Sequence, residues 1–215
     1  MTYLCINSNY PFLLTTFRRL EKASGHKTIQ VMKKFLLTAI AMMAMCVSLY
    51  AQNQADIAAS SERVAKLQEL LKKTPKTCGI GEIDNYNNDL VRAAKSLVEN
   101  SDKLQAFNDR LTAVAQGTEG AQMPTFDEMD ALARSIKGEV KTVLAVKDGA
   151  TGLTTAVSTL NNKLSNANAL EKVKIAKQAA NATKIVDFSK DVLPLVVEES
   201  TAQAKIVDDF IKMLK

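Results

Sequence analysis

The stretch that decides the fold is residues 81–116, GEIDNYNNDLVRAAKSLVENSDKLQAFNDRLTAVAQ. Two interleaved sets of residues repeat in it every seven positions: Ile83, Leu90, Leu97, Leu104 and Leu111, and Tyr86, Ala93, Asn100, Phe107 and Val114. Nine of these ten are apolar, which is typical of the seam of a left-handed coiled coil or a long bundle helix. The exception, Asn100, lies in the seam itself. At 1.5 Å per residue, this helix would span about 54 Å.

The sequence downstream of residue 52 predicts helices throughout. Ala, Leu, Lys, Glu, Gln and Asn dominate it, and the strand-like alternation of β-branched residues is missing. Besides 81–116, we expect helices over about 55–73, 125–165 and 169–213. We therefore predict an all-α fold, an elongated antiparallel bundle of about four helices with coiled-coil-like packing, and a single domain over 52–215.

Local sequence patterns predict where the third helix begins and which of its residues are apolar. Thr125 and Glu128 have the spacing of a capping box at its start. Its expected apolar stripe is Phe126, Met129, Ala133, Ile136, Val140 and Val143. The stripe resumes one residue out of register at Leu153, so residues 148–152 form either a turn or part of a continuous, kinked helix. We favour the continuous helix, and we expect the next reversal in the Asn-rich stretch 161–168.

The last helix has a less regular pattern. Its expected buried face comprises Ile185, Phe188, Val192, Leu195, Ala202 and Ile206, with Phe210 near the end. Glu199 falls close to this stripe. Pro194 lies within the pattern and removes one backbone donor, so we expect a kink near Lys190.

The residues from Met32 to Ala51 predict a secretory signal peptide. They read MKKFLLTAIAMMAMCVSLYA, with a basic start, an apolar middle and a small residue at the end. The alternatives are a transmembrane anchor, for which the apolar run is short, a lipoprotein modified at Cys46, and a buried core helix. We expect cleavage after Ala51, with residues 1–31 as an untranslated or disordered leader. The product would be exported: periplasmic, associated with the outer envelope, or secreted.

Charge and composition after residue 51 argue against several classes of function. Residues 1–51 contain six of the 28 basic residues and one of the 23 acidic ones, so the remainder has 22 of each and no net charge. This balance, with few aromatic residues, predicts no nucleic-acid binding. The single histidine, His26, precedes the signal, which excludes histidine-dependent catalysis and zinc or di-iron motifs downstream.

The remaining reactive groups predict no catalytic, cofactor-binding or metal-binding residues. Cys78 is the single cysteine after residue 51, and we interpret it as a loop thiol, with an intermolecular disulfide or a reactive thiol as alternatives. Asp127, Glu128 and Asp130 suit the first turn of a helix. Neighbouring acids at 198–199 and 208–209 would point about 100° apart on a helix and would not converge.

Two functions remain open. The first is a non-enzymatic structural or protein-interaction module of the cell envelope, with a protein partner or self-association possible. The second is a membrane-active bundle that uses residues 142–160, TVLAVKDGATGLTTAVSTL. A long bundle with such an apolar, Gly-containing segment resembles the helical pore-forming toxins in general plan. That resemblance implies membrane contact but identifies no particular residue.

Overall fold

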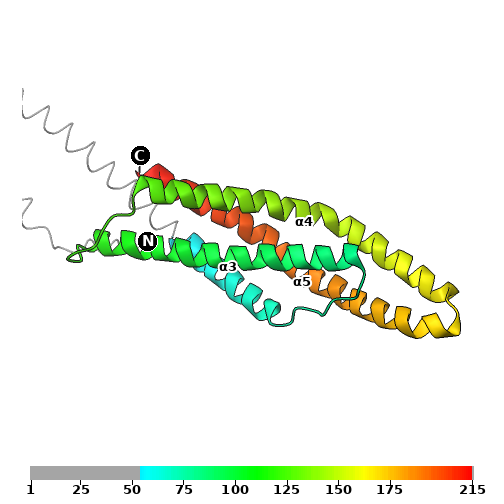
Figure 1. Ribbon diagram of the computed structural model, residues 1–215. Coiled ribbons are helices and arrows are strands. Elements are labelled where there is room, and N and C mark those ends of the chain that lie inside the picture. Colours follow the sequence, from blue (N-terminus) through cyan, green and yellow to red (C-terminus); the bar gives the residue numbers. More distant parts are fainter. Residues whose placement is uncertain (1–53, 215) are drawn as a thin grey trace, which may run out of the picture. The chain divides into compact units, whose positions relative to one another are not determined.

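Every regular element in the described part of the chain is an α-helix. The computed structural model describes residues 54–214, so the predicted leader and signal peptide lie outside the described residues. A helix over 54–71 precedes α3 (Gly81–Ala115), α4 (Phe126–Asn166) and α5 (Ala169–Leu214), labelled as in Figure 1. No strand occurs within residues 54–214. The all-α prediction is confirmed, and the described helices form a bundle.

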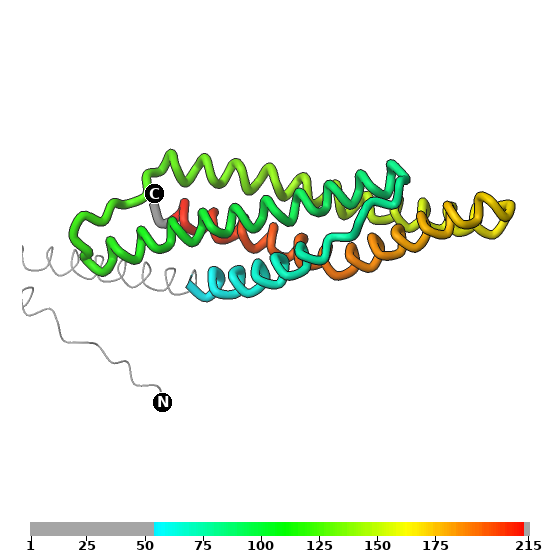
Figure 2. The backbone as a smooth tube through the Cα atoms, turned by 60° about the horizontal axis from the view of Figure 1, so that its bottom comes forward, coloured from blue at the N-terminus to red at the C-terminus, as the bar shows by residue number. Residues whose placement is uncertain are grey.

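The helices lie side by side and alternate in direction (Figures 1 and 2). α3, α4 and α5 each pack against the other two. The helix over 54–71 lies along α5, to which Arg63 and Asp56 tie it through ion pairs with Glu199 and Lys205. Because α3 packs against α4 and α5, the predicted seam of α3 is filled by the chain's own helices.

The capping signals are observed where the sequence places them. Thr125 Oγ1 accepts a hydrogen bond from the backbone N–H of Glu128, and the Glu128 side chain accepts one from the backbone N–H of Thr125. This reciprocal pairing satisfies two of the free donors at the start of α4. The predicted capping box is confirmed.

Two local predictions about α4 agree with the structure. Residues 148–152 are helical, so the continuous helix is the correct alternative. The chain reverses at residues 167–168, at the end of the predicted stretch 161–168, because α4 continues to Asn166. Ser165 and Asn166 donate side-chain hydrogen bonds to the backbone carbonyls four residues earlier. Asn168 instead accepts from the N–H of Glu171 and caps α5.

The seam of α3 is buried along most of its length. Ile83, Leu90, Leu97 and Leu104 are at most 2% exposed, whereas Leu111 and the residues near it are half-buried. Two hydrophobic clusters make up the core. The large cluster extends from Leu67 and Ile83 to Val196, and the terminal cluster gathers around Leu104, Ile136 and Phe210.

Four predicted core positions need correction, and one of them, Val140 of α4, is half-buried. Phe126 is the first residue of α4 and is 44% exposed. On α5, Leu195 and Ala202 are half-buried, while the fully buried residues are their neighbours Val196 and Gln203. The other five residues predicted for this face, Ile185, Phe188, Val192, Ile206 and Phe210, are buried, so the buried face differs from the prediction by one residue only over 195–203.

Candidate functional site

Buried polar side chains separate the two hydrophobic clusters. On α3, Asn100 and Ser101 lie between Leu97 of the large cluster and Leu104 of the terminal cluster. We call the following set the polar layer: Ser60, Asn100, Ser101, Glu139, Glu199, Ser200 and Gln203. It draws residues from the helix over 54–71 and from α3, α4 and α5, so every described helix contributes to it.

Glu199 is the centre of the hydrogen bonds in this layer. Its side chain is completely buried. Ser60 Oγ donates to its Oε1, and Arg63 Nε donates to its Oε2 over 2.8 Å. Gln203 Nε2 donates to the same Oε1 over 2.9 Å and to the backbone carbonyl of Leu97 over 2.7 Å. A buried carboxylate needs such partners, because its desolvation otherwise costs several kcal/mol.

Three buried polar atoms at this level have no hydrogen-bond partner among the described residues: Asn100 Nδ2, Glu139 Oε1 and Gln203 Oε1. Each unsatisfied buried group costs about 1–3 kcal/mol. Ser60, whose hydroxyl donates to the Glu199 carboxylate, is 2% exposed. The polar layer thus has the character of a structural element that fixes how the helices meet.

The sequence interpretation found only part of this layer. It singled out Asn100 in the seam and placed Glu199 close to the apolar stripe. It missed Ser60 and Gln203, because serine and glutamine are ordinary on exposed helix faces. A usable signal existed in the spacing of Glu199 and Gln203, which are four residues apart and therefore share a helix face.

One groove runs along α5 and has a volume of about 650 Å³. Its floor includes Leu193, Val197 and Thr201, which are spaced four residues apart on α5. Charged side chains surround this floor: Asp56, Arg63, Lys147, Glu198 and Lys205. Arg63 joins the groove to the polar layer, because it bonds both Glu198 at the rim and the buried Glu199. We call this the α5 groove.

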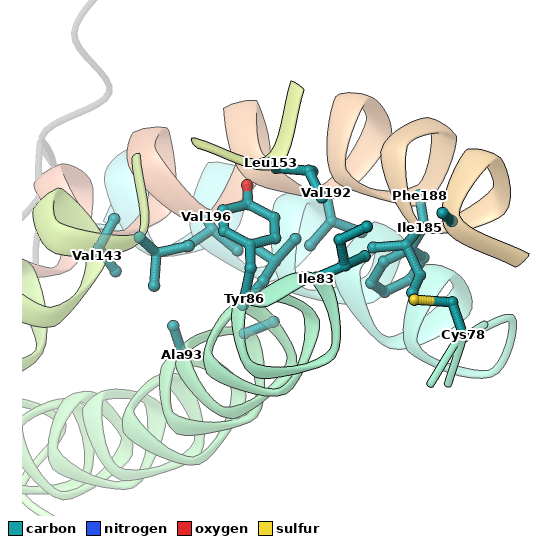
Figure 3. Packing of buried hydrophobic residues seen from close by; sticks show 14 of the residues in the cluster. Cys78, Ile83, Tyr86, Ala93, Val143, Leu153, Ile185, Phe188, Val192 and Val196 are labelled. Atoms are coloured by element: carbon teal, nitrogen blue, oxygen red, sulfur yellow. The ribbon is translucent and has the colours of Figure 1, made fainter. Parts of the chain in front are cut away.

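A second groove, of about 450 Å³, lies between α3 and α4. Tyr86 lines it, and its hydroxyl is 2.7 Å from Ser189 Oγ within the core. A Cβ atom on Gly149 would lie 3.4 Å from the Tyr86 ring, at ordinary van der Waals distance. Figure 3 shows Tyr86 reaching from α3 toward Leu153 and Val192.

Cys78 is buried in the large cluster. Figure 3 places it near Ile185 and Phe188 of α5. Burial raises the pKa of its thiol, which favours the protonated, unreactive form. The preceding interpretation as a loop thiol agrees with its position before α3, where the N–H groups of Cys78 and Gly79 donate to the Asp84 carboxylate.

The carboxylates singled out in the sequence are not gathered into one site. Glu128 pairs with Arg110, and Asp208 pairs with Lys137. Glu199 is buried while its neighbour Glu198 is exposed, so the adjacent pair points in different directions. Within residues 54–214, no group of three or more His, Cys, Asp or Glu side chains is arranged to hold a metal ion.

The segment 142–160 contributes to the core. Its buried side chains are Val143, Val146, Leu153 and Leu160, all in the large cluster. No helix in the described range is long and apolar enough to cross a bilayer. The turn between α4 and α5 lies beyond this segment, at residues 167–168, and not at Lys147 and Asp148. A pore-forming use of 142–160 would require these side chains to leave the core, and it stays an untested prediction.

Comparison with known proteins gives no assignment. No family model, curated protein or solved structure matches this chain. Its function must therefore be argued from its own residues.

Proposed function

We propose that this protein is an exported, non-enzymatic helical bundle that acts as a protein-interaction module of the cell envelope. In this proposal the elongated antiparallel bundle, with coiled-coil-like packing, provides a stable support. The α5 groove accepts an amphipathic helix from a partner protein.

The observation that carries the proposal is the stripe Leu193, Val197 and Thr201 on the floor of the α5 groove. Residues four apart form a ridge on a helix, and such ridges pack into the grooves of a neighbouring helix. Ala59 of the helix over 54–71 and Ala202 of α5 leave room beside the ridge. An apolar floor within a charged rim is the arrangement that binds the apolar face of an amphipathic helix.

The rim would set the orientation of the partner. Asp56 and Glu198 carry negative charge, and Arg63, Lys147 and Lys205 carry positive charge. Both signs are present, so a partner helix with alternating charges beside its apolar face fits better than a uniformly charged one. Lys147 forms no ion pair among the described residues and is free to bind an acidic residue of the partner.

The polar side chains of the core support a non-enzymatic role. Ser60 and Gln203 each donate a hydrogen bond to Glu199, and these bonds hold the helices together. The Cys78 thiol is buried. Export is supported by the signal features from Met32 to Ala51, and it is tested separately below.

A capture experiment tests the groove. The purified protein and two variants are incubated with solubilised native envelope. Thr201→Arg places a long charged side chain on the groove floor. Thr183→Arg is the matched control, because both threonines are exposed on α5 and both donate a 3.0 Å hydrogen bond to the carbonyl four residues earlier.

A partner retained by the parent and by Thr183→Arg, but lost by Thr201→Arg, would support the proposal. A partner bound equally by all three would place the interaction elsewhere and overturn it. Light scattering covers a further outcome: a dimer that Thr201→Arg dissociates would show that the occupant is a second copy of this chain, which also contradicts a separate partner.

A further inference from the structure

The end of the α4–α5 pair, near the turn between these helices, exposes apolar and basic side chains that lie outside both grooves. The loop before α3 reaches α5 where Asn181 Nδ2 donates to the carbonyl of Thr77. Beyond that level α4 and α5 continue together to their turn, past α3 and the helix over 54–71 (Figure 2). We call residues 155–177 the distal hairpin. Neither groove includes any residue of it.

The distal hairpin holds the most exposed large apolar side chains described. Leu170 is 91% exposed and Val173 is 76% exposed. Together with Lys174 and Lys177 they occupy positions i, i+3, i+4 and i+7, which lie on one face of a helix. The first turn of α5 thus presents two aliphatic side chains, and two lysines follow on the same face.

Charge is distributed unevenly along the chain. The distal hairpin contains the basic residues Lys163, Lys172, Lys174 and Lys177 and one acidic residue, Glu171. Its net charge is +3, although the chain from Gln52 onward is neutral, so the rest carries −3. All four lysines are exposed, and none forms an ion pair within the described range.

The facing part of α4 is free of charge over residues 155–162. The hydroxyls of Thr155 and Thr159 donate to the carbonyls of Thr151 and Thr155, so their hydrogen-bonding demand is met by the helix itself. Because these hydroxyls already donate to backbone carbonyls, the free energy cost of moving this surface out of bulk water is lower.

We infer that the distal hairpin docks end-on to an anionic phospholipid surface. Leu170 and Val173 enter the interfacial region, and the surrounding lysines bind lipid phosphates while their alkyl chains lie along the apolar layer. A flat, anionic surface fits this tip better than an acidic protein does. A stable protein interface buries about 800 Å² of each partner, whereas an anionic lipid surface can be bound by a few aliphatic and basic side chains.

A vesicle sedimentation assay tests this inference with the full chain. The probes are mixed phosphatidylcholine–phosphatidylglycerol vesicles and pure phosphatidylcholine vesicles. One double variant, Leu170→Ser with Val173→Ser, removes the apolar contact. A second, Lys174→Glu with Lys177→Glu, reverses two charges. Its matched control is Lys95→Glu with Lys103→Glu, which makes the same change at exposed, unpaired lysines of α3.

The parent and the α3 control should bind the mixed vesicles and not the neutral ones. Each hairpin variant should bind the mixed vesicles at least about tenfold more weakly. For the lysine variant the reason is that each lysine near an anionic surface is worth about fivefold in affinity. For the Leu170 and Val173 variant the reason is the lost apolar contact. Circular dichroism on each variant confirms that the helices are intact; all four substituted hairpin residues are exposed, so folding should be unchanged.

Three outcomes would overturn the inference. They are absence of binding to mixed vesicles, an equal loss in the α3 control, and binding that brings dye release from the vesicles, which would indicate insertion of a pore. Thr201→Arg should bind vesicles like the parent. A negative result in the vesicle assay would therefore not contradict the proposal for the α5 groove, and a negative capture experiment would not contradict the inference for the distal hairpin.

Discussion

Arg63 Nε donates a 2.8 Å hydrogen bond to Oε2 of Glu199, and this contact joins the first described helix to the centre of α5. The Glu199 side chain is fully buried and that of Arg63 is 16% exposed. The pair connects the interior of the bundle to the α5 groove, because the same guanidinium also reaches Glu198 at the surface. A change at Arg63 should therefore affect stability and the groove together.

Arg63→Ala should destabilise the protein by about 3–5 kcal/mol, since it leaves the buried Glu199 carboxylate without its charged partner. Urea unfolding followed by circular dichroism measures the difference. Arg134→Ala is the control, because its ion pair with Asp130 lies on the surface and should contribute less than about 1 kcal/mol. Equal effects of the two substitutions would show that Glu199 does not depend on Arg63.

Leu104→Ala tests the buried seam of α3. Leu104 is 2% exposed in the terminal cluster, so the substitution should cost about 2–5 kcal/mol through lost transfer energy and a residual cavity. Leu104→Asp should be worse, because it buries a charge without a partner. Leu144→Ala, at a side chain 48% exposed, is the control. A thermal midpoint within about one degree of the parent for Leu104→Ala would mean that the stripe faces water.

Asn100→Leu should stabilise the bundle. The Asn100 side chain is 2% exposed and its Nδ2 has no partner among the described residues, so leucine removes an unsatisfied group and adds apolar contact. The same change removes a polar residue from the seam, where such residues specify register and association state. Thermal melts report the stability and light scattering reports the association state. A lower thermal midpoint would reveal that the amide is well satisfied.

Glu128 should make stability depend on pH in the acid range. Its pKa falls from 4.5 to about 2, chiefly because the Thr125 backbone N–H donates to it and also because Arg110 does. Since the folded pKa is lower than the unfolded one, the stabilisation is complete above about pH 4.5 and is lost as the pH falls toward 2. Thermal melts of the parent and Glu128→Gln should differ at pH 7 and converge at low pH.

Arg110→Ala provides the cross-check for Glu128. The guanidinium also binds the carbonyls of Gln122 and Met123, so its removal should lower the thermal midpoint at every pH. In the Arg110→Ala background, the difference between Glu128 and its Gln variant should shrink. A difference of unchanged size would assign the whole effect to the capping box.

The protein isolated from its native cells should begin at Gln52. The signal features end at Ala51, where a small residue precedes the polar chain. N-terminal sequencing and intact mass measure the product. A start at Thr2 would contradict export by this signal, and a lipidated Cys46 would replace cleavage after Ala51 with lipoprotein processing.

The sequence by itself determined where the helices begin and end. Capping at Thr125 and Glu128 involves neighbouring residues, and the seven-residue repeat from Ile83 to Leu104 is a property of one helix. Both signals depend on residues one or two helical turns apart, so they can be read without knowing how the rest of the chain folds. The shifted stripe around residues 148–152 allowed either a turn or an unbroken helix, and the structure shows the unbroken helix that we favoured.

Only the tertiary structure decided which residues of α5 are buried between Val192 and Ile206 and what the polar ones among them do. Gln203 is buried and Ala202 is half-buried, although the apolar pattern indicated the reverse, because Gln203 finds the Leu97 carbonyl and Glu199 as partners. The free energy of burying a polar group depends on partners from other helices. Helices of unequal length pack together to form the polar layer, the α5 groove and the distal hairpin. This packing depends on residues far apart in the chain, so no single stretch of sequence predicts it.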